Sequence, residues 1–239
     1  MKNIRVAVSS PSFSANFILR QELEYVFDCV CFNNSKKNLL PDEMSQFVGE
    51  AEALIVGLEK VDSQLLHSCQ NLKVISKYGV GINNIDFQAA KQKNISVMYT
   101  PGVNRRSVSE LTIGYMLGIS RNIFNSVMSL RAGLWIKDGG FEISGKKIGI
   151  IGFGNIGQDV AKLLEPFGVA IYVCDIKPMY DLCQERKYQV SSFEKILREC
   201  DILTLHVPYD ESTHHLIGKN ELNMLKEGAI MINTSRGRH

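Results

Sequence analysis

The sequence predicts an α/β protein of two domains, each built on a mostly parallel sheet. Short apolar runs alternate with amphipathic stretches along the first hundred residues, and a second such series begins at Ile148. This alternation is typical of parallel strands that are covered by helices. Thr100-Pro101-Gly102 breaks the pattern between the two series, so we place the domains at residues 1–100 and 101–239.

The first domain contains five candidate strands separated by four candidate helices. Ser12 or Ser14, Asp62 and Asp86 stand where N-caps are expected, because their side chains accept hydrogen bonds from the first turn of a helix. The alternation favours an open, flavodoxin-like sheet. The strands are placed at residues 4–8, 26–31, 53–56, 72–76 and 95–98, and the helices at 14–24, 42–50, 63–69 and 86–93.

A long stretch with helical periodicity opens the second domain. We predict one helix over residues 107–130, in which Gly114 and Gly118 permit close packing against another backbone. Residues 129–135 continue with apolar side chains that an isolated domain has no means to cover. These segments predict a homodimer built on the second domain.

The remainder of the second domain is predicted to repeat the strand–helix alternation. Between its first strand and first helix stands Gly152-Phe153-Gly154-Asn155-Ile156-Gly157, which has the pattern G-x-G-x-x-G. The strands are placed at residues 148–151, 170–174, 202–205 and 229–233, and the helices at 155–167, 192–199 and 219–226.

Each glycine of this motif has a physical role in binding a dinucleotide. Gly152 makes the tight turn, Gly154 lets the backbone approach a pyrophosphate, and Gly157 lets the helix pack on the strand. The anion is bound by the N–H groups of Asn155 and Ile156, at the positive end of the helix. A lone motif of this kind is weak evidence, since many such strings are ordinary turns.

The acid that follows the motif makes the prediction specific. The second strand ends in Asp175, eighteen residues past Gly157. A carboxylate there accepts hydrogen bonds from the adenosine ribose and repels a 2′-phosphate. The order of strand, glycines, helix, strand and acid therefore predicts a Rossmann-like domain that binds NAD in preference to NADP.

Composition and charge exclude several classes of protein. The chain is 45% hydrophobic and 22% charged with a net charge of +2, which gives no reason to expect binding to nucleic acid or to a membrane surface. No apolar run reaches the ~18 residues that span a bilayer, and the N-terminus lacks a signal-peptide layout. The six cysteines form no cluster with zinc-ligand spacing. We expect a cytoplasmic protein without a metal ion.

Five motifs occur in order: residues 77–86, residues 100–104, the glycine motif, His206-Val207-Pro208 and residues 232–237. With these motifs the chain resembles the D-2-hydroxyacid dehydrogenase family over nearly its whole length, most closely the phosphoglycerate dehydrogenase-like branch. The resemblance implies a flavodoxin-like substrate domain followed by an NAD-binding Rossmann domain. It also implies hydride transfer between nicotinamide and a small 2-hydroxy or 2-keto acid, with 3-phosphoglycerate among the candidates.

The resemblance also implies roles for residues of the first domain and the crossover. The backbone N–H groups of Val80 and Gly81 are expected to hold the substrate carboxylate, and Lys77 to add a cation for a carboxylate or phosphate. A plain turn between strand and helix is the alternative for this loop. Asn104 is expected to reach substrate or nicotinamide, or to cap the helix that follows it.

Arg236 is the expected catalytic residue of the second domain. It follows an apolar strand at the carboxyl edge of the sheet, where ligands bind in open α/β folds. A guanidinium there can hold the substrate carboxylate and polarise the carbonyl oxygen as hydride arrives. Thr234 and Ser235 of the same motif, and Val207 and Pro208 after the preceding strand, are expected to contact the cofactor.

Two further expectations concern His206 and the end of the chain. His206 is expected to be structural, because the family histidine at that position is not the acid. Family members continue beyond the arginine motif with a catalytic glutamate, a catalytic histidine and further strands. We therefore expect an incomplete Rossmann domain if the chain ends at His239, with weak NAD binding and negligible turnover. The alternative function is a noncatalytic NAD-binding or interaction protein, which a stop codon directly after His239 would favour.

Overall fold

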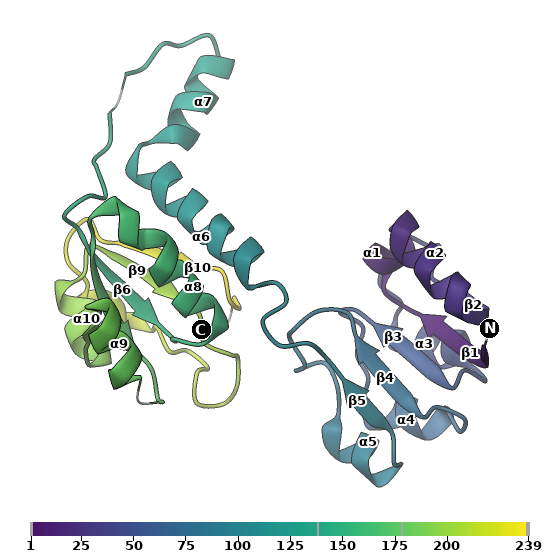
Figure 1. The fold of residues 1–239 in the computed structure, drawn as a ribbon. Coiled ribbons are helices and arrows are strands. Elements are labelled where there is room, and N and C mark those ends of the chain that lie inside the picture. The colour runs from purple at the N-terminus through teal and green to yellow at the C-terminus, as the bar shows by residue number, and fades with distance from the viewer. Residues whose placement is uncertain (1, 138, 178, 238–239) are drawn as a thin grey trace. The chain divides into compact units, whose positions relative to one another are not determined.

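Two five-stranded sheets, one in each half of the chain, organise the structure (Figure 1). The computed structural model describes residues 2–137, 139–177 and 179–237. These residues form two units that divide between Val103 and Asn104. All paired strands in both sheets run parallel, which confirms the predicted α/β class.

Unit 1 has the strand order β2-β1-β3-β4-β5. All five predicted strands are confirmed, with ends that differ by at most two residues. The strands are β1 (Lys2–Val8), β2 (Phe27–Phe32), β3 (Ala53–Val56), β4 (Val74–Lys77) and β5 (Ser96–Met98). The helices are α1 (Pro11–Ser14), α2 (Phe17–Val26), α3 (Pro41–Val48), α4 (Ser63–Ser68) and α5 (Phe87–Gln92).

Neighbouring residues of β1 pack into different cores of unit 1. Ala7 belongs to a cluster that α3, α4 and α5 complete, whereas Val8 packs in a second cluster with Phe13 of α1. Successive side chains of a strand point to opposite faces of the sheet, so these helix groups cover opposite faces. This double cover explains why β3, which lies inside the sheet, is a continuous apolar run.

One helix prediction in unit 1 is wrong. The expected helix at residues 14–24 is two helices, α1 and α2, and their N-caps are Ser10 and Asn16 rather than Ser12 or Ser14. Pro11 stands at the first position of α1, which its fixed φ favours, and the Asn16 side chain accepts the N–H of Leu19 at 3.1 Å to start α2. The expected caps of α4 and α5 are confirmed (Asp62 and Asp86).

Unit 2 has the strand order β10-β9-β6-β7-β8. The four predicted strands are confirmed, whereas β8 and α9 were not predicted. The strands are β6 (Lys147–Ile151), β7 (Ala170–Cys174), β8 (Gln189–Val190), β9 (Ile202–Leu205) and β10 (Ile230–Asn233). The helices are α6 (Arg105–Ser120), α7 (Ile123–Arg131), α8 (Asn155–Leu164), α9 (Tyr180–Arg186), α10 (Phe193–Glu199) and α11 (Lys219–Met224), with a 3-10 turn at Glu165–Phe167.

The core of unit 2 also lies on both faces of its sheet. Ile150 packs with Val160 and Leu164 of α8, and the next residue, Ile151, packs with Leu197 of α10. These side chains are at most 3% exposed. Each contributes roughly 1.5–3 kcal/mol by burial. Among the residues described, no helix has the length and apolarity needed to cross a membrane.

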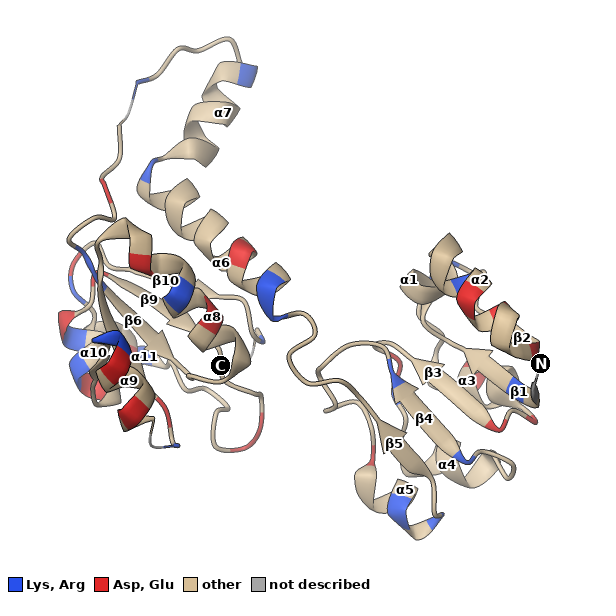
Figure 2. Ribbon diagram, in the orientation of Figure 1, with Lys and Arg blue, Asp and Glu red and all other residues tan. Residues whose placement is uncertain are grey.

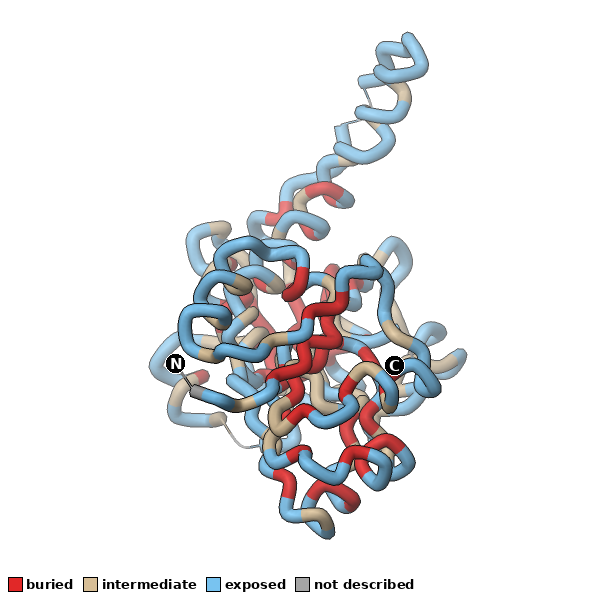
Figure 3. The backbone as a smooth tube through the Cα atoms, turned by 90° about the vertical axis from the view of Figure 1, so that its right-hand side faces the viewer, coloured by how far each residue is buried: buried red, intermediate tan, exposed pale blue. Residues whose placement is uncertain are grey.

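The single helix predicted over residues 107–130 is wrong, because the chain turns between α6 and α7. Asn122 adopts a left-handed conformation with φ 53° and separates the two helices. A Cβ at Gly118 would lie 2.5 Å from the Phe124 ring, so this glycine permits the close approach of α7. We call residues 123–136 the arm; it extends from unit 2 and is mostly exposed (Figure 3).

Candidate functional site

The glycine turn after β6 is fixed by contacts within unit 2. Gly152 has φ +89°, and a Cβ there would lie 2.7 Å from the backbone of His206. A Cβ at Gly157 would lie 2.1 Å from the carbonyl oxygen of Gly152. These two positions therefore exclude side chains for conformational and packing reasons, as the motif analysis expects.

Gly154 differs from the other two glycines, because the protein itself does not require it. Its φ of −77° is open to any residue, and a Cβ there would meet nothing within 4 Å. Gly154 is the N-cap residue of α8, whose first turn has no side-chain cap. The N–H groups of Asn155 and Ile156 are thus in place for an anion that approaches the backbone. This geometry fits a pyrophosphate.

Asp175 lies beside the glycine turn. Its Oδ2 accepts the backbone N–H of Phe153 at 2.5 Å, and its Oδ1 accepts the N–H of Lys177 at 2.8 Å. The carboxylate therefore holds the end of β7 against the turn. An ionised carboxylate has about four acceptor sites, so both oxygens retain capacity for ribose hydroxyls.

The segment after β9 closes another side of the turn. Burial lowers the pKa of His206 to about 4, so its imidazole is neutral at physiological pH. Its Nε2 lies 3.0 Å from Thr204 Oγ1, and its buried Nδ1 has no hydrogen-bond partner among the described residues. Val207 adjoins the turn, because its Cγ1 would lie 2.9 Å from a Cβ at Gly152. Pro208 follows on the surface.

The segment after β10 folds around the Asn233 side chain. Asn233 Oδ1 accepts the N–H and the hydroxyl of Ser235 at 2.9 and 2.7 Å, and Asn233 Nδ2 donates to the carbonyl of Arg236 at 2.7 Å. Thr234 Oγ1 lies 3.1 Å from Thr112 Oγ1 of α6. Arg236 is exposed, and its Nη1 donates to the Ser235 carbonyl at 2.9 Å. Its guanidinium pairs with no carboxylate in the described part of the chain.

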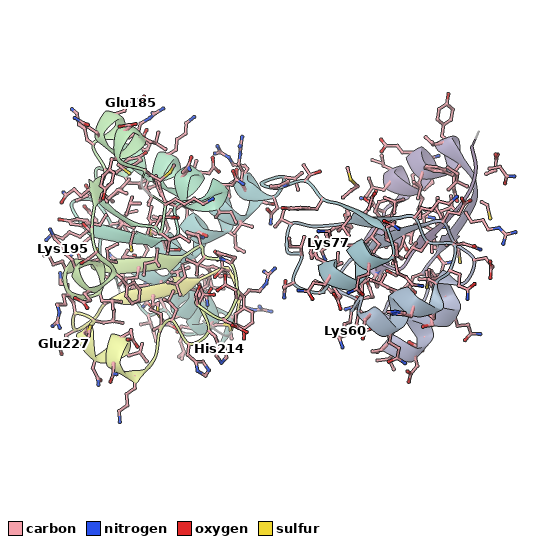
Figure 4. All side chains as sticks on the ribbon, turned by 90° about the horizontal axis from the view of Figure 1, so that it is seen from below. Lys60, Lys77, Glu185, Lys195, His214 and Glu227 are labelled. Atoms are coloured by element: carbon pink, nitrogen blue, oxygen red, sulfur yellow. The ribbon has the colours of Figure 1, made fainter. Side chains whose placement is uncertain are left out.

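In unit 1, Lys77 is almost fully buried. It is the last residue of β4 (Figure 4) and only 8% exposed. Its Nζ donates to the carbonyl of Gly57, which also accepts from Asn84 Nδ2 at 3.1 Å. The ammonium thus joins the carboxyl ends of β3 and β4. Its role toward substrate stays a prediction.

The loop after Lys77 offers backbone donors. Gly79 has φ +127°, a value that favours glycine. In the described part of the chain, no acceptor engages the N–H groups of Val80 or Gly81. These two groups are therefore available to a carboxylate, as the substrate-loop hypothesis requires.

Each unit also holds a polar side chain with a buried oxygen that has no partner among the described groups. Glu59 was not expected as a site residue; it is 3% exposed, and its Oε2 accepts the Gly57 N–H at 2.9 Å and the Ser9 hydroxyl at 3.2 Å. Asn104 is the N-cap residue of α6, but its side chain does not cap the helix. The Asn104 Oδ1 is buried without a partner among the described groups, and so is the Glu59 Oε1.

Comparisons with known proteins agree with this geometry. A model of the "D-isomer specific 2-hydroxyacid dehydrogenase, NAD binding domain" matches residues 113–239. Hydroxypyruvate reductase from Thermotoga maritima is 40% identical over 207 residues, which are 85% of this chain and 66% of that protein. Glyoxylate reductase from Thermococcus litoralis is 37% identical over 200 residues, which are 80% of this chain and 60% of that protein. The chain therefore spans less than two thirds of either reductase.

A solved structure resembles the whole fold. The cofactor (NAD+)-bound 3-phosphoglycerate dehydrogenase of Entamoeba histolytica matches with a TM-score of 0.80 at 26% identity. The match covers 99% of this chain and 73% of that one.

Proposed function

Because the chain belongs to the D-isomer specific 2-hydroxyacid dehydrogenase family, we propose that it is an oxidoreductase acting at C2 of a small 2-hydroxy or 2-keto acid. Its cofactor is NAD, which supplies or accepts the hydride when bound. The observation that carries the proposal is Gly154, whose missing side chain leaves open space at the uncapped start of α8. The test is keto-acid-dependent oxidation of NADH.

We assign the substrate contacts to backbone donors and one guanidinium. In unit 1, the N–H groups of Val80 and Gly81 bind a carboxylate; in unit 2, Arg236 binds a carboxylate or the C2 oxygen. A guanidinium near that oxygen stabilises the negative charge that develops as hydride arrives. The lack of a carboxylate partner for Arg236 within the described residues supports this role.

The names of the relatives support a proposal for the substrate. Two relatives are named reductases of hydroxypyruvate and glyoxylate, and the solved structure is a 3-phosphoglycerate dehydrogenase. We propose a two- or three-carbon 2-keto acid as the substrate, and keep the phosphorylated acid as a candidate.

The six cysteines are free thiols, which supports a cytoplasmic location.

NADH is expected to bind more tightly than NADPH. The Asp175 carboxylate would lie a few ångströms from a 2′-phosphate, and this repulsion costs on the order of 1–4 kcal/mol at a partly exposed site. The difference corresponds to roughly fivefold to several hundredfold in affinity. Fluorescence titration with both cofactors measures it.

Asp175→Ala should narrow the difference in affinity between NADH and NADPH, mainly by strengthening NADPH binding. Asp181→Ala is the matched control, because Asp181 is an exposed acid of the neighbouring α9. Equal affinities of the unmodified protein for NADH and NADPH would refute the role of Asp175.

We propose that the arm is the core of a homodimer interface. Trp135, Met128 and Leu134 are 82%, 65% and 57% exposed, respectively. Covering each such side chain contributes roughly 1.5–3 kcal/mol.

Light scattering at micromolar concentration should give the mass of a dimer, and Met128→Glu combined with Trp135→Glu should give a monomer. Leu222→Glu, at an exposed residue of α11, should leave the dimer intact. A monomeric unmodified protein would exclude this interface.

A further inference from the structure

A basic pocket lies beside the glycine turn, within unit 2. Its volume is about 230 Å³, and three basic side chains line it: Arg105 at the start of α6, Lys162 of α8 and Arg186 of α9. The basic segments of α6 and α8 are visible in Figure 2. Asp159 of α8 is the only carboxylate among the lining residues.

Two of the three basic side chains that line the pocket have no carboxylate partner in the part of the chain that the structure describes. Arg105 and Lys162 make no ion pair within the described residues. Arg186 has only long contacts, with Nη1 3.6 Å from Glu165 and Nε 3.8 Å from Glu185. The Asp159 Oδ1 is held by the Arg106 Nη2 at 2.9 Å, so this carboxylate is already paired with a cation from outside the lining.

The second carboxylate oxygen of Asp159 indicates which kind of anion the pocket can bind. Oδ2 is buried and has no hydrogen-bond partner in the described part of the chain, and the side chain is 9% exposed. A buried carboxylate oxygen without a donor is costly. An anion that keeps a proton can donate to it while its other oxygens meet the basic groups. Phosphate keeps at least one proton at neutral pH, whereas sulfate keeps none.

We propose that this pocket binds a hydrogenphosphate group, either free phosphate or the protonated form of a small monophosphate ester, and that its occupancy weakens NAD binding. Two residues that line the pocket connect it to the glycine turn, where NAD binds. Asn155 is the first residue of α8, and the Gln158 Nε2 donates to the carbonyl of Phe153 in the glycine turn at 2.9 Å.

The charge of the basic side chains predicts that phosphate in the pocket weakens NADH binding. The basic groups of the pocket raise the positive potential where the cofactor pyrophosphate binds, and an anion in the pocket cancels that potential. NADH and phosphate therefore weaken each other's binding by the same factor. Unlike competition for a single site, this effect reaches a plateau once the pocket is full.

The experiment is a set of NADH fluorescence titrations of the unmodified protein at increasing phosphate, with ionic strength held constant by sodium chloride. The NADH Kd should rise and level off at about fivefold. Sulfate should change it by less than about twofold, because sulfate cannot donate to Asp159. Lys162→Met should abolish the phosphate effect, whereas Lys219→Met, at an exposed lysine outside the pocket, should retain it.

Any one of three results would overturn the proposal. The NADH Kd could rise with phosphate without limit, which would mean that phosphate competes with NADH at the glycine turn. Sulfate could raise the NADH Kd as much as phosphate does, or phosphate could raise it equally in Lys162→Met. Glycerol 3-phosphate, titrated near pH 6 where about half of it is protonated, separates the two sources. A plateau with this ester supports an ester ligand, and a plateau with phosphate alone supports free phosphate. The NADH Kd without phosphate tests the cofactor site independently.

Discussion

Gly154→Val is expected to weaken NADH binding by roughly fivefold to a hundredfold without disturbing the fold. The added side chain meets no protein atom within 4 Å of its Cβ, and φ −77° suits valine. It fills the space through which the pyrophosphate approaches the backbone. Overpacking of this kind costs about 1–3 kcal/mol, and each 1.4 kcal/mol is about tenfold in affinity.

The measurement pairs NADH titration with thermal unfolding. Gly114→Val is the control, because a Cβ at Gly114 of α6 also meets nothing within 4 Å and lies outside the turn. Both variants should unfold near the temperature of the unmodified protein, and only Gly154→Val should lose NADH affinity. Unchanged NADH affinity in Gly154→Val would mean that the pyrophosphate lies elsewhere.

Arg236→Gln is expected to lower turnover of a 2-keto acid by about 10²–10³, the usual loss when one group that stabilises an oxyanion is removed. The fold should persist, because Arg236 is exposed and, among the described residues, its side chain donates only to the adjacent Ser235 carbonyl. Arg236→Lys should recover part of the rate, since lysine keeps the charge but not the planar, two-pronged donor.

Steady-state kinetics of both variants give kcat and KM separately. Loss of kcat indicates polarisation of the C2 oxygen, and a raised KM alone indicates that Arg236 only holds the carboxylate. Arg198→Gln, at an exposed arginine of α10, should match the unmodified protein. Turnover of Arg236→Gln within about threefold of the unmodified protein would remove Arg236 from the mechanism.

The sequence predicts buried strands more accurately than short surface elements. β3, β7 and β9 lie at the predicted residues because each is a short, mostly apolar run in a sheet covered on both faces. β8 has only two residues, both exposed, so it carries no apolar signal. The break at Asn122 was missed because a lone asparagine does not mark a turn when helical periodicity continues on both sides.

Site residues were predictable where backbone geometry dictates residue type. Gly152 and Gly157 occupy positions where a side chain would collide with the backbone, and the motif encodes this requirement. Charged residues were harder to place. Nothing in the sequence indicates that Lys77 donates to the Gly57 carbonyl, or that Glu59 is buried beside the same strand end. Those contacts depend on which strands are neighbours, β3 and β4 in this case.

The central claim is most directly tested by following NADH oxidation with glyoxylate, hydroxypyruvate and 3-phosphohydroxypyruvate, using the protein as its gene encodes it. We expect keto-acid-dependent oxidation with at least one of the three, near the ~10 s⁻¹ that is typical of enzymes, and a lower kcat/KM with NADPH. A protein that binds NADH but oxidises it no faster with any of these acids than without them would contradict the account.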